Sequence, residues 1–140
     1  MEQALLEIED LHVEYRTDET RVFAVNGLNL SVREGETLGL VGETGAGKTT
    51  TALSVLRLLP ERVGRITKGR VVLDGVDITA STEADMRLLR GDRVSMIFQD
   101  PMTSLNPVLT VGAQVAEVLE LHKKNPNKRA VEQRVDEILT

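Results

Sequence analysis

One glycine-rich segment, Gly42–Thr50, constrains this chain more than any other. It follows the apolar run Leu38–Val41 and precedes the helix-like run Thr51–Leu59. It matches the pattern G-x-x-x-x-G-K-[ST] in the order strand, turn, helix that the pattern requires. Glycines let a backbone curl into a concave nest, and a helix N-terminus offers unpaired N–H groups with partial positive charge. With the compact charge of Lys48 and a hydroxyl from Thr49 for Mg²⁺, the segment is predicted to bind nucleotide phosphates.

The alternative is a glycine-rich turn that carries the Lys-Thr pair by chance. At average residue usage the four fixed positions match a chain of this length on the order of once in a few hundred sequences. The flanking runs make a chance match rarer still. Nucleotide binding is therefore the preferred interpretation.

Composition excludes several other classes of protein. The 140 residues suffice for one modest domain, and a net charge of −5 disfavours a nucleic-acid surface. There is no cysteine, which excludes disulfides and thiolate metal sites. No run approaches the roughly 20 apolar residues of a membrane span, so any spanning is expected from partner chains.

Apolar periodicity predicts the secondary structure along the chain. The runs Thr37–Val41 and Val94–Phe98 are expected to be strands covered on both faces, and residues 61–68 are expected to form a polar loop. Further strands are predicted over residues 5–15, 22–32 with a bend or bulge at Asn26-Gly27, and 70–78 with an Asp-Gly turn; helices are predicted over residues 48–59, 82–89 after the capping box Thr82–Asp85, 111–122 and 131–139.

A second polar constellation follows the predicted strand Val94–Phe98, in Phe98–Pro107. The amide of Gln99 can accept from water or bind Mg²⁺ through its carbonyl and donate through its NH₂. It could therefore sense a γ-phosphate and its metal. On side-chain chemistry alone, a surface glutamine at a strand end is the simpler interpretation.

Taken together, these segments resemble the ATP-binding subunit of an ABC transporter. The resemblance covers essentially all 140 residues as the N-terminal part of such a subunit. The segments Phe23–Asn26, Gly35–Glu43 and Phe98–Pro107 are closest to the oligopeptide/dipeptide importer subfamily, although nickel, glutathione and other small-ligand importers share them.

The resemblance implies an α/β fold, with a P-loop NTPase core and an antiparallel β subdomain. It divides the chain into an antiparallel β region (1–36 and 69–79), the P-loop core (37–68 and 80–107) and the start of a helical subdomain (108–140). The chain is expected to be truncated, because it ends inside a helical pattern.

The resemblance also implies roles for individual residues. Lys48 bridges the β- and γ-phosphates, Thr49 ligates Mg²⁺, and Thr50 lies near the α-phosphate. Tyr15 stacks on adenine, and Gln99 contacts Mg²⁺ or the attacking water, which makes Lys48 and Gln99 the catalytic pair within this chain. The residues so assigned to ATP are Tyr15, Gly42, Gly45, Ala46, Gly47, Lys48, Thr49 and Thr50.

Three partners follow from the resemblance: transmembrane permease subunits, a second ATPase subunit and, indirectly, a solute-binding protein. The loop Asp100 to Leu105 resembles the surface that receives the permease. The implied location is the cytoplasmic face of the plasma (inner) membrane, where the subunit is peripheral.

The chain departs from the family in what it lacks. It has no Leu-Ser-Gly-Gly-Gln-like signature and no apolar strand ending in Asp-Glu, and His12 and His122 do not occupy the family's switch position. Two alternatives therefore stay open: an ABC ATPase not coupled to transport, and a fragment that binds nucleotide without catalysis.

We expect these 140 residues alone to bind nucleotide weakly and to hydrolyse none measurably, because the general base and the signature loop are missing. The measurement is phosphate release by the purified 140-residue chain. Steady turnover that Lys48→Ala abolishes would contradict the expectation.

Overall fold

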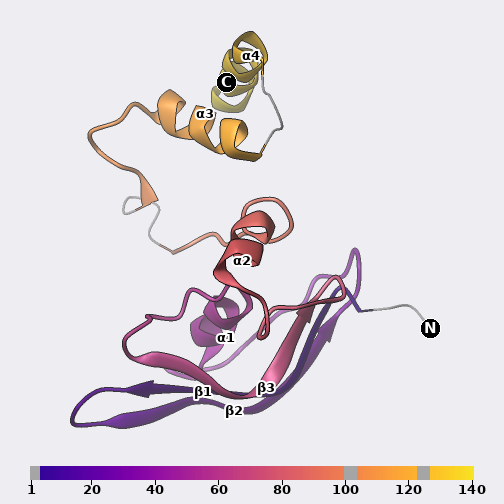
Figure 1. Ribbon diagram of the computed structural model, residues 1–140, viewed down its shortest axis with the longest axis vertical. Helices are drawn as coiled ribbons and strands as arrows, with labels where there is room; N and C mark the ends of the chain where they lie inside the picture. Colours follow the sequence, from indigo (N-terminus) through magenta and orange to yellow (C-terminus); the bar gives the residue numbers. More distant parts are fainter. Residues whose placement is uncertain (1–3, 100–103, 123–126) are drawn as a thin grey trace. The chain divides into compact units, whose positions relative to one another are not determined.

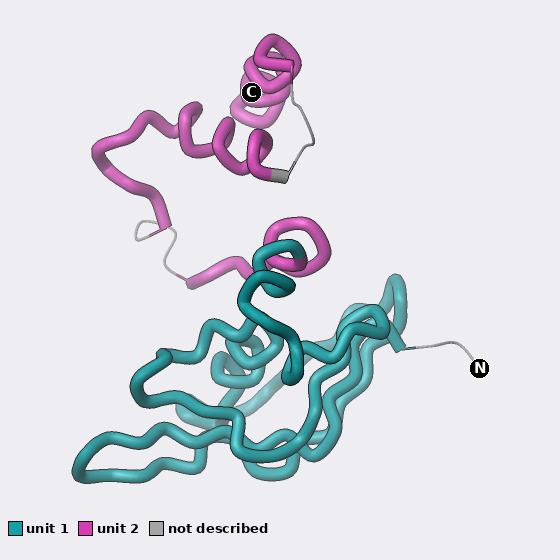
Figure 2. The backbone as a smooth tube through the Cα atoms, in the orientation of Figure 1, with its two compact units in different colours: residues 1–88 teal, residues 89–140 magenta. Residues whose placement is uncertain are grey.

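The computed structural model describes residues 4–99, 104–122 and 127–140, which belong to two compact units, residues 1–88 and 89–140 (Figure 2). The elements in chain order are β1 (Leu6–Arg16), β2 (Arg21–Val32), α1 (Lys48–Val55), β3 (Gly64–Leu73), β4 (Val76–Asp77), α2 (Glu83–Leu89), α3 (Val111–His122) and α4 (Lys128–Leu139) (Figure 1).

The first unit is built on a four-stranded antiparallel sheet in the order β2-β1-β3-β4. Figure 1 shows α1 lying over one face of this sheet. Burying one aliphatic side chain completely stabilises the fold by roughly 1.5–3 kcal/mol relative to leaving it exposed, so the interior of this unit is its main source of stability. The buried apolar side chains here are Ile8, Leu11, Val13, Val25, Val55, Leu56, Val71, Leu73, Ile78 and Met86.

β3 begins at Gly64, so the prediction of a polar loop over residues 61–68 holds for the turn at 61–63 and was wrong for 64–68. The strand pairs with β1 over this part, with Tyr15 opposite Gly64 and Val13 opposite Ile66. Backbone pairing with a central strand satisfies the N–H and C=O groups whatever the polarity of the outward side chains. Tertiary pairing therefore overrides the polar composition of the segment.

The two predicted buried strands are not formed. Residues 37–41 contain no strand and Val41 is 94% exposed, while in 94–98 the only pairing is a single bridge between Arg90 and Val94, and Ile97 is 96% exposed. Strands that are apolar on both faces need hydrogen-bonded neighbours and covering helices. Within the described residues no strand pairs with either run, which explains the difference.

Helix α1 ends four residues before its predicted end. The N–H of Leu58 donates to the carbonyl of Leu53 at 2.8 Å, and the N–H of Arg57 donates to that of Ser54 at 3.1 Å. These two bonds form a Schellman motif, with Arg57 in the left-handed region at φ 50°. The Arg57 guanidinium also donates to the carbonyl of Ser81. The backbone turn at Arg57 thus ends the helix, ahead of the predicted stop at Pro60.

The predicted capping box at the start of α2 is confirmed. The N–H of Thr82 donates to the carboxylate of Asp85 at 2.9 Å, and the N–H of Asp85 donates to the hydroxyl of Thr82 at 3.2 Å. Two N–H groups at the helix start are thereby satisfied. The helix then begins at Glu83, close to the predicted position.

The predicted bulge at Asn26-Gly27 is also confirmed. Pairing between β1 and β2 passes from Leu11 opposite Leu28 to His12 opposite Asn26, which leaves Gly27 without a partner. Gly27 has φ 71°, the left-handed region that glycine adopts without strain.

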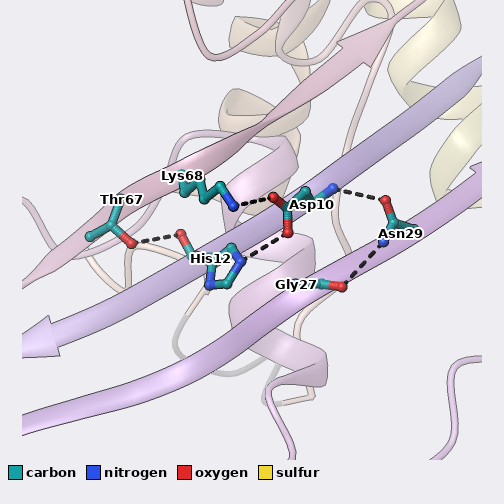
Figure 3. A network of polar contacts seen from close by, with 6 residues as sticks. All are labelled: Asp10, His12, Gly27, Asn29, Thr67 and Lys68. Atoms are coloured by element: carbon teal, nitrogen blue, oxygen red, sulfur yellow. Dashed lines mark hydrogen bonds and ion pairs between the residues drawn. The ribbon is translucent and has the colours of Figure 1, made fainter.

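A polar network occupies the neighbouring irregularity of β1, at Asp10 (Figure 3). The Asp10 carboxylate contacts His12 Nε2 at 2.9 Å and accepts from Lys68 Nζ at 2.6 Å. The Asp10 N–H donates to Asn29 Oδ1 at 2.9 Å. Hydrogen bonds from Lys68 and then His12 lower the pKa of the Asp10 carboxyl. One aspartate thus joins three strands where their regular pairing is interrupted.

The second unit contains the pair α3 and α4, as predicted. Val131 and Val135 of α4 are its buried apolar residues among those described. The Gln114 side chain accepts from the N–H of Asn106 at 2.8 Å and donates to the carbonyls of Asn106 and Leu109. This side chain holds the segment before α3 against the helix.

We predict that Gly69→Ala destabilises the protein by about 2–3 kcal/mol. Gly69 has φ 94°, and a Cβ there would lie 2.3 Å from the carbonyl oxygen of Asp10. The matched control is Gly35→Ala, which has φ 72° but no atom within 4 Å of the added Cβ; it should cost only about 1 kcal/mol. Denaturant unfolding of both variants measures the difference, and equal losses would contradict the prediction.

The Asp10 network predicts a dependence of stability on pH. A carboxyl whose pKa is lowered by folding stabilises the protein above its ordinary pKa of 3.8, and this contribution is lost as the pH falls through the lowered value. Asp10→Asn should therefore lower the unfolding midpoint more at pH 7 than at pH 3. Asp18→Asn, in the exposed turn after β1, is the matched control for replacing a carboxyl by an amide. Equal effects of Asp10→Asn at both pH values would refute the role of the ion pairs.

Candidate nucleotide-binding site

The phosphate loop, Gly42–Thr50, leads into α1 through two glycines in the left-handed region. Gly45 has φ 87° and Gly47 has φ 83°. A Cβ at Gly47 would lie 2.3 Å from the carbonyl oxygen of Ala24 in β2, whereas one at Gly45 would meet no atom within 4 Å. Gly47 is thus required both by its backbone angle and by close packing against the sheet.

The start of α1 presents a row of unpaired donors. The first helical hydrogen bond runs from the N–H of Thr51 to the carbonyl of Gly47, at 2.8 Å. Among the described residues, nothing accepts a hydrogen bond from the N–H groups of residues 47–50, and the first turn contains no acidic side chain. Such a helix start favours an anion through its N–H groups and its dipole. The phosphates of a nucleotide fit this chemistry.

Lys48 places its charge at this helix start. Its Nζ donates to the carbonyl oxygens of Gly42 at 2.5 Å and Glu43 at 2.7 Å. Within the described part of the chain no carboxylate forms an ion pair with Lys48. The ammonium group is therefore held over the loop by neutral carbonyls, and its charge remains uncompensated.

Thr49 is exposed at the start of α1, whereas the side chain of Thr50 is buried. Residues 4–99, 104–122 and 127–140 contain no group of three or more His, Cys, Asp or Glu side chains that could hold a metal. Mg²⁺ is commonly bound through one or two protein ligands together with substrate phosphates. The Thr49 hydroxyl is compatible with that arrangement.

Tyr15, at the end of β1, meets α1. Its hydroxyl lies 3.3 Å from the Thr50 hydroxyl, at hydrogen-bonding distance, and its ring is half-buried. Thus the structure brings Tyr15 to the first turn of α1, which continues the phosphate loop. Tyr15 and Thr50 are 35 positions apart in the sequence.

Gln99 belongs to the second unit, where its side chain is exposed. Its proposed contact with Mg²⁺ stays a prediction. Most of the predicted permease-contacting loop, Asp100 to Leu105, lies outside the described residues, because the description of this segment resumes at Ser104.

Sequence reasoning missed two residues that shape the site. Ala24 supplies the carbonyl that packs against Gly47, and Gly64 of β3 faces the ring of Tyr15. Ala24 has a small apolar side chain in an apolar strand, so no local pattern distinguishes it. Gly64 lay in the segment taken for a loop, where a glycine carries no special meaning.

Comparison with known proteins identifies the family of the chain. The model of the family described as ABC transporter matches residues 25–140. The chain therefore belongs to this family. None of its helices in the described ranges has the length and apolar content that crossing a membrane demands.

Similar curated proteins are ATP-binding proteins of peptide transport. The chain is 48% identical over 132 residues to the oligopeptide transport ATP-binding protein OppD of Escherichia coli, covering 94% of this chain and 39% of that protein. It is 45% identical over 135 residues to AppD of Bacillus subtilis, an oligopeptide transport ATP-binding protein, covering 96% and 41%. The predicted resemblance to peptide importers is confirmed. The chain spans about two-fifths of the length of these relatives.

Solved structures confirm the predicted fold class. A dimeric bacterial ABC transporter cassette, MJ0796, superposes with a TM-score of 0.82 at 23% identity, covering 96% of this chain and 55% of that chain. The same cassette has been solved bound to ADP and Pi. The cbiO1 protein of Clostridium perfringens, part of an ABC transporter complex, gives a TM-score of 0.67 at 25% identity, covering 99% and 50%.

Proposed function

We propose that this chain binds ATP with Mg²⁺ through the phosphate loop, in a subunit whose ATP hydrolysis drives the import of peptides or related small solutes. The observation that carries the proposal is the start of α1, where unpaired N–H groups and the uncompensated charge of Lys48 meet. Both features favour a polyanion.

Each residue of the site has a separate task in this proposal. The N–H groups of residues 45–49 donate to the phosphates, Lys48 supplies positive charge to the β- and γ-phosphates, and Thr49 offers its hydroxyl to the metal. Gln99 contacts the metal or the attacking water. Bound Mg²⁺-ATP supplies the phosphoanhydride bond to be broken and a metal that neutralises charge on it.

The base site is proposed at Tyr15. An aromatic face that stacks on a nucleobase is worth roughly 1–3 kcal/mol. The half-buried ring lies beside the first turn of α1, through its contact with Thr50. A base and a triphosphate could therefore be bound by one continuous surface.

The proposals about transport and about partner subunits are based on the similar proteins. OppD of Escherichia coli and AppD of Bacillus subtilis are named as oligopeptide transport ATP-binding proteins, and a cassette of the same fold is solved as a dimer. We infer a peripheral subunit at the cytoplasmic face of the membrane. Its partners would be a second ATPase subunit, permease subunits that meet the loop Asp100 to Leu105, and, indirectly, a solute-binding protein.

The decisive experiment compares Lys48→Ala with Lys128→Ala in the full-length protein. Lys48 is the first residue of α1 and Lys128 is the first residue of α4, so the pair is matched in helix position. Titration calorimetry with Mg²⁺-ATP should show affinity reduced by about 10- to 100-fold in Lys48→Ala, because a charge-assisted hydrogen bond is lost. Lys128→Ala should bind like the wild type.

Uptake of a labelled oligopeptide by cells that carry each variant tests the transport role. Lys48→Ala should abolish uptake and Lys128→Ala should not. Unchanged ATP affinity in Lys48→Ala would refute the nucleotide site. Undiminished uptake with impaired ATP binding would instead favour an ABC ATPase that does not drive peptide import.

A further inference from the structure

We infer that the side chain of Thr50 is a positioning residue for the base-binding ring of Tyr15, so that α1 couples base recognition to the phosphate loop. The inference rests on the proposed function, because it assigns a task within the same nucleotide site. It differs from the role implied by family resemblance, which places Thr50 at the α-phosphate.

The hydroxyl of Thr50 is directed at Tyr15. The two side-chain oxygens are 3.3 Å apart, and they join the end of β1 to the first turn of α1 across 35 positions in the sequence. Thr50 is only 9% exposed. A buried hydroxyl needs a hydrogen-bond partner, and the phenol of Tyr15 provides one. The distance is longer than the about 2.5–3.0 Å usual for O–H···O hydrogen bonds, so its contribution is modest.

The backbone of Thr50 has a different environment from its side chain. Its carbonyl accepts from the Ser54 hydroxyl at 2.7 Å, which fixes the first turn of the helix. Its N–H belongs to the row of unpaired donors at the start of α1. Backbone and side chain of one residue can thus serve two parts of a nucleotide: the N–H serves the phosphates, and the hydroxyl orients the ring that receives the base.

The Tyr15 ring also lies close to the backbone of Gly64. A Cβ at Gly64 would lie 3.0 Å from Cε1 of Tyr15 and 3.1 Å from Cβ of Leu59. The N–H of Gly64 donates to the carbonyl of Pro60 at 2.7 Å, which holds this backbone in place. Since Gly64 is not in the left-handed region, alanine is compatible with its backbone and would act by crowding the Tyr15 ring together with Leu59 and Pro60.

Four variants of the full-length protein separate the two roles of Thr50. Thr50→Val removes the hydroxyl at nearly constant shape, Thr50→Ser keeps it, Tyr15→Phe removes its partner, and Gly64→Ala displaces the ring. Two probes are titrated against each variant by calorimetry: Mg²⁺-ATP, and inorganic tripolyphosphate with Mg²⁺, which has the phosphates without the base.

We expect Thr50→Val and Tyr15→Phe each to weaken ATP binding about threefold, and the double variant to be no weaker than either one, because both remove the same hydrogen bond. Gly64→Ala should weaken ATP binding similarly. Tripolyphosphate affinity should stay unchanged in all of them, which also shows that the site remains folded. Thr50→Ser should bind both probes like the wild type.

Two results would overturn the inference while leaving the nucleotide site intact. Equal loss of ATP and tripolyphosphate in Thr50→Val would place its hydroxyl at the phosphates. Unchanged ATP affinity in both Thr50→Val and Tyr15→Phe would show that the bond does not position the ring. A wild-type protein that binds neither probe would instead overturn the proposed function, and this inference with it.

Discussion

The close approach of β2 to the phosphate loop is the constraint on which the rest of this site depends. The carbonyl oxygen of Ala24 lies where a side chain of Gly47 would otherwise be, 2.3 Å from an ideal Cβ. The pairing of β1 with β2 slips near Ala24, between the pairs formed by Val13 and Glu14. An irregular strand and a glycine in the left-handed region together let the sheet reach the start of α1.

This contact explains why Tyr15 can belong to the site at all. Once the loop is docked on β2, the neighbouring strand β1 ends beside the first turn of α1, where Tyr15 meets Thr50. β1 pairs with β2 and β3, and Tyr15 itself lies opposite Val22 and Gly64. The position of the aromatic ring relative to the loop is thus set by strand pairing.

Prediction from sequence succeeded where a signal is local and failed where a partner is distant. The capping box at Thr82 and the bulge at Gly27 depend on a few adjacent residues, and both predictions are confirmed. The strand start at Gly64 depends on pairing with β1 about 50 residues away, and it was missed. Runs such as Thr37–Val41 are apolar enough for strands, but a strand exists only with hydrogen-bonded neighbours.

The same distinction between local and distant signals applies to the residues of the candidate site. The phosphate loop is recognisable from the spacing of its glycines and Lys48, whereas Ala24 acts through a backbone carbonyl that leaves no mark on the sequence. The adenine role of Tyr15 is implied by family resemblance, whereas its contact with Thr50 depends on the three-dimensional fold, which brings together residues 35 positions apart. Because Tyr15 is the only tyrosine of these 140 residues and tryptophan is absent, the near-ultraviolet fluorescence of this segment arises essentially from one ring. That ring lies at the proposed base site, so the segment carries its own optical probe of occupancy.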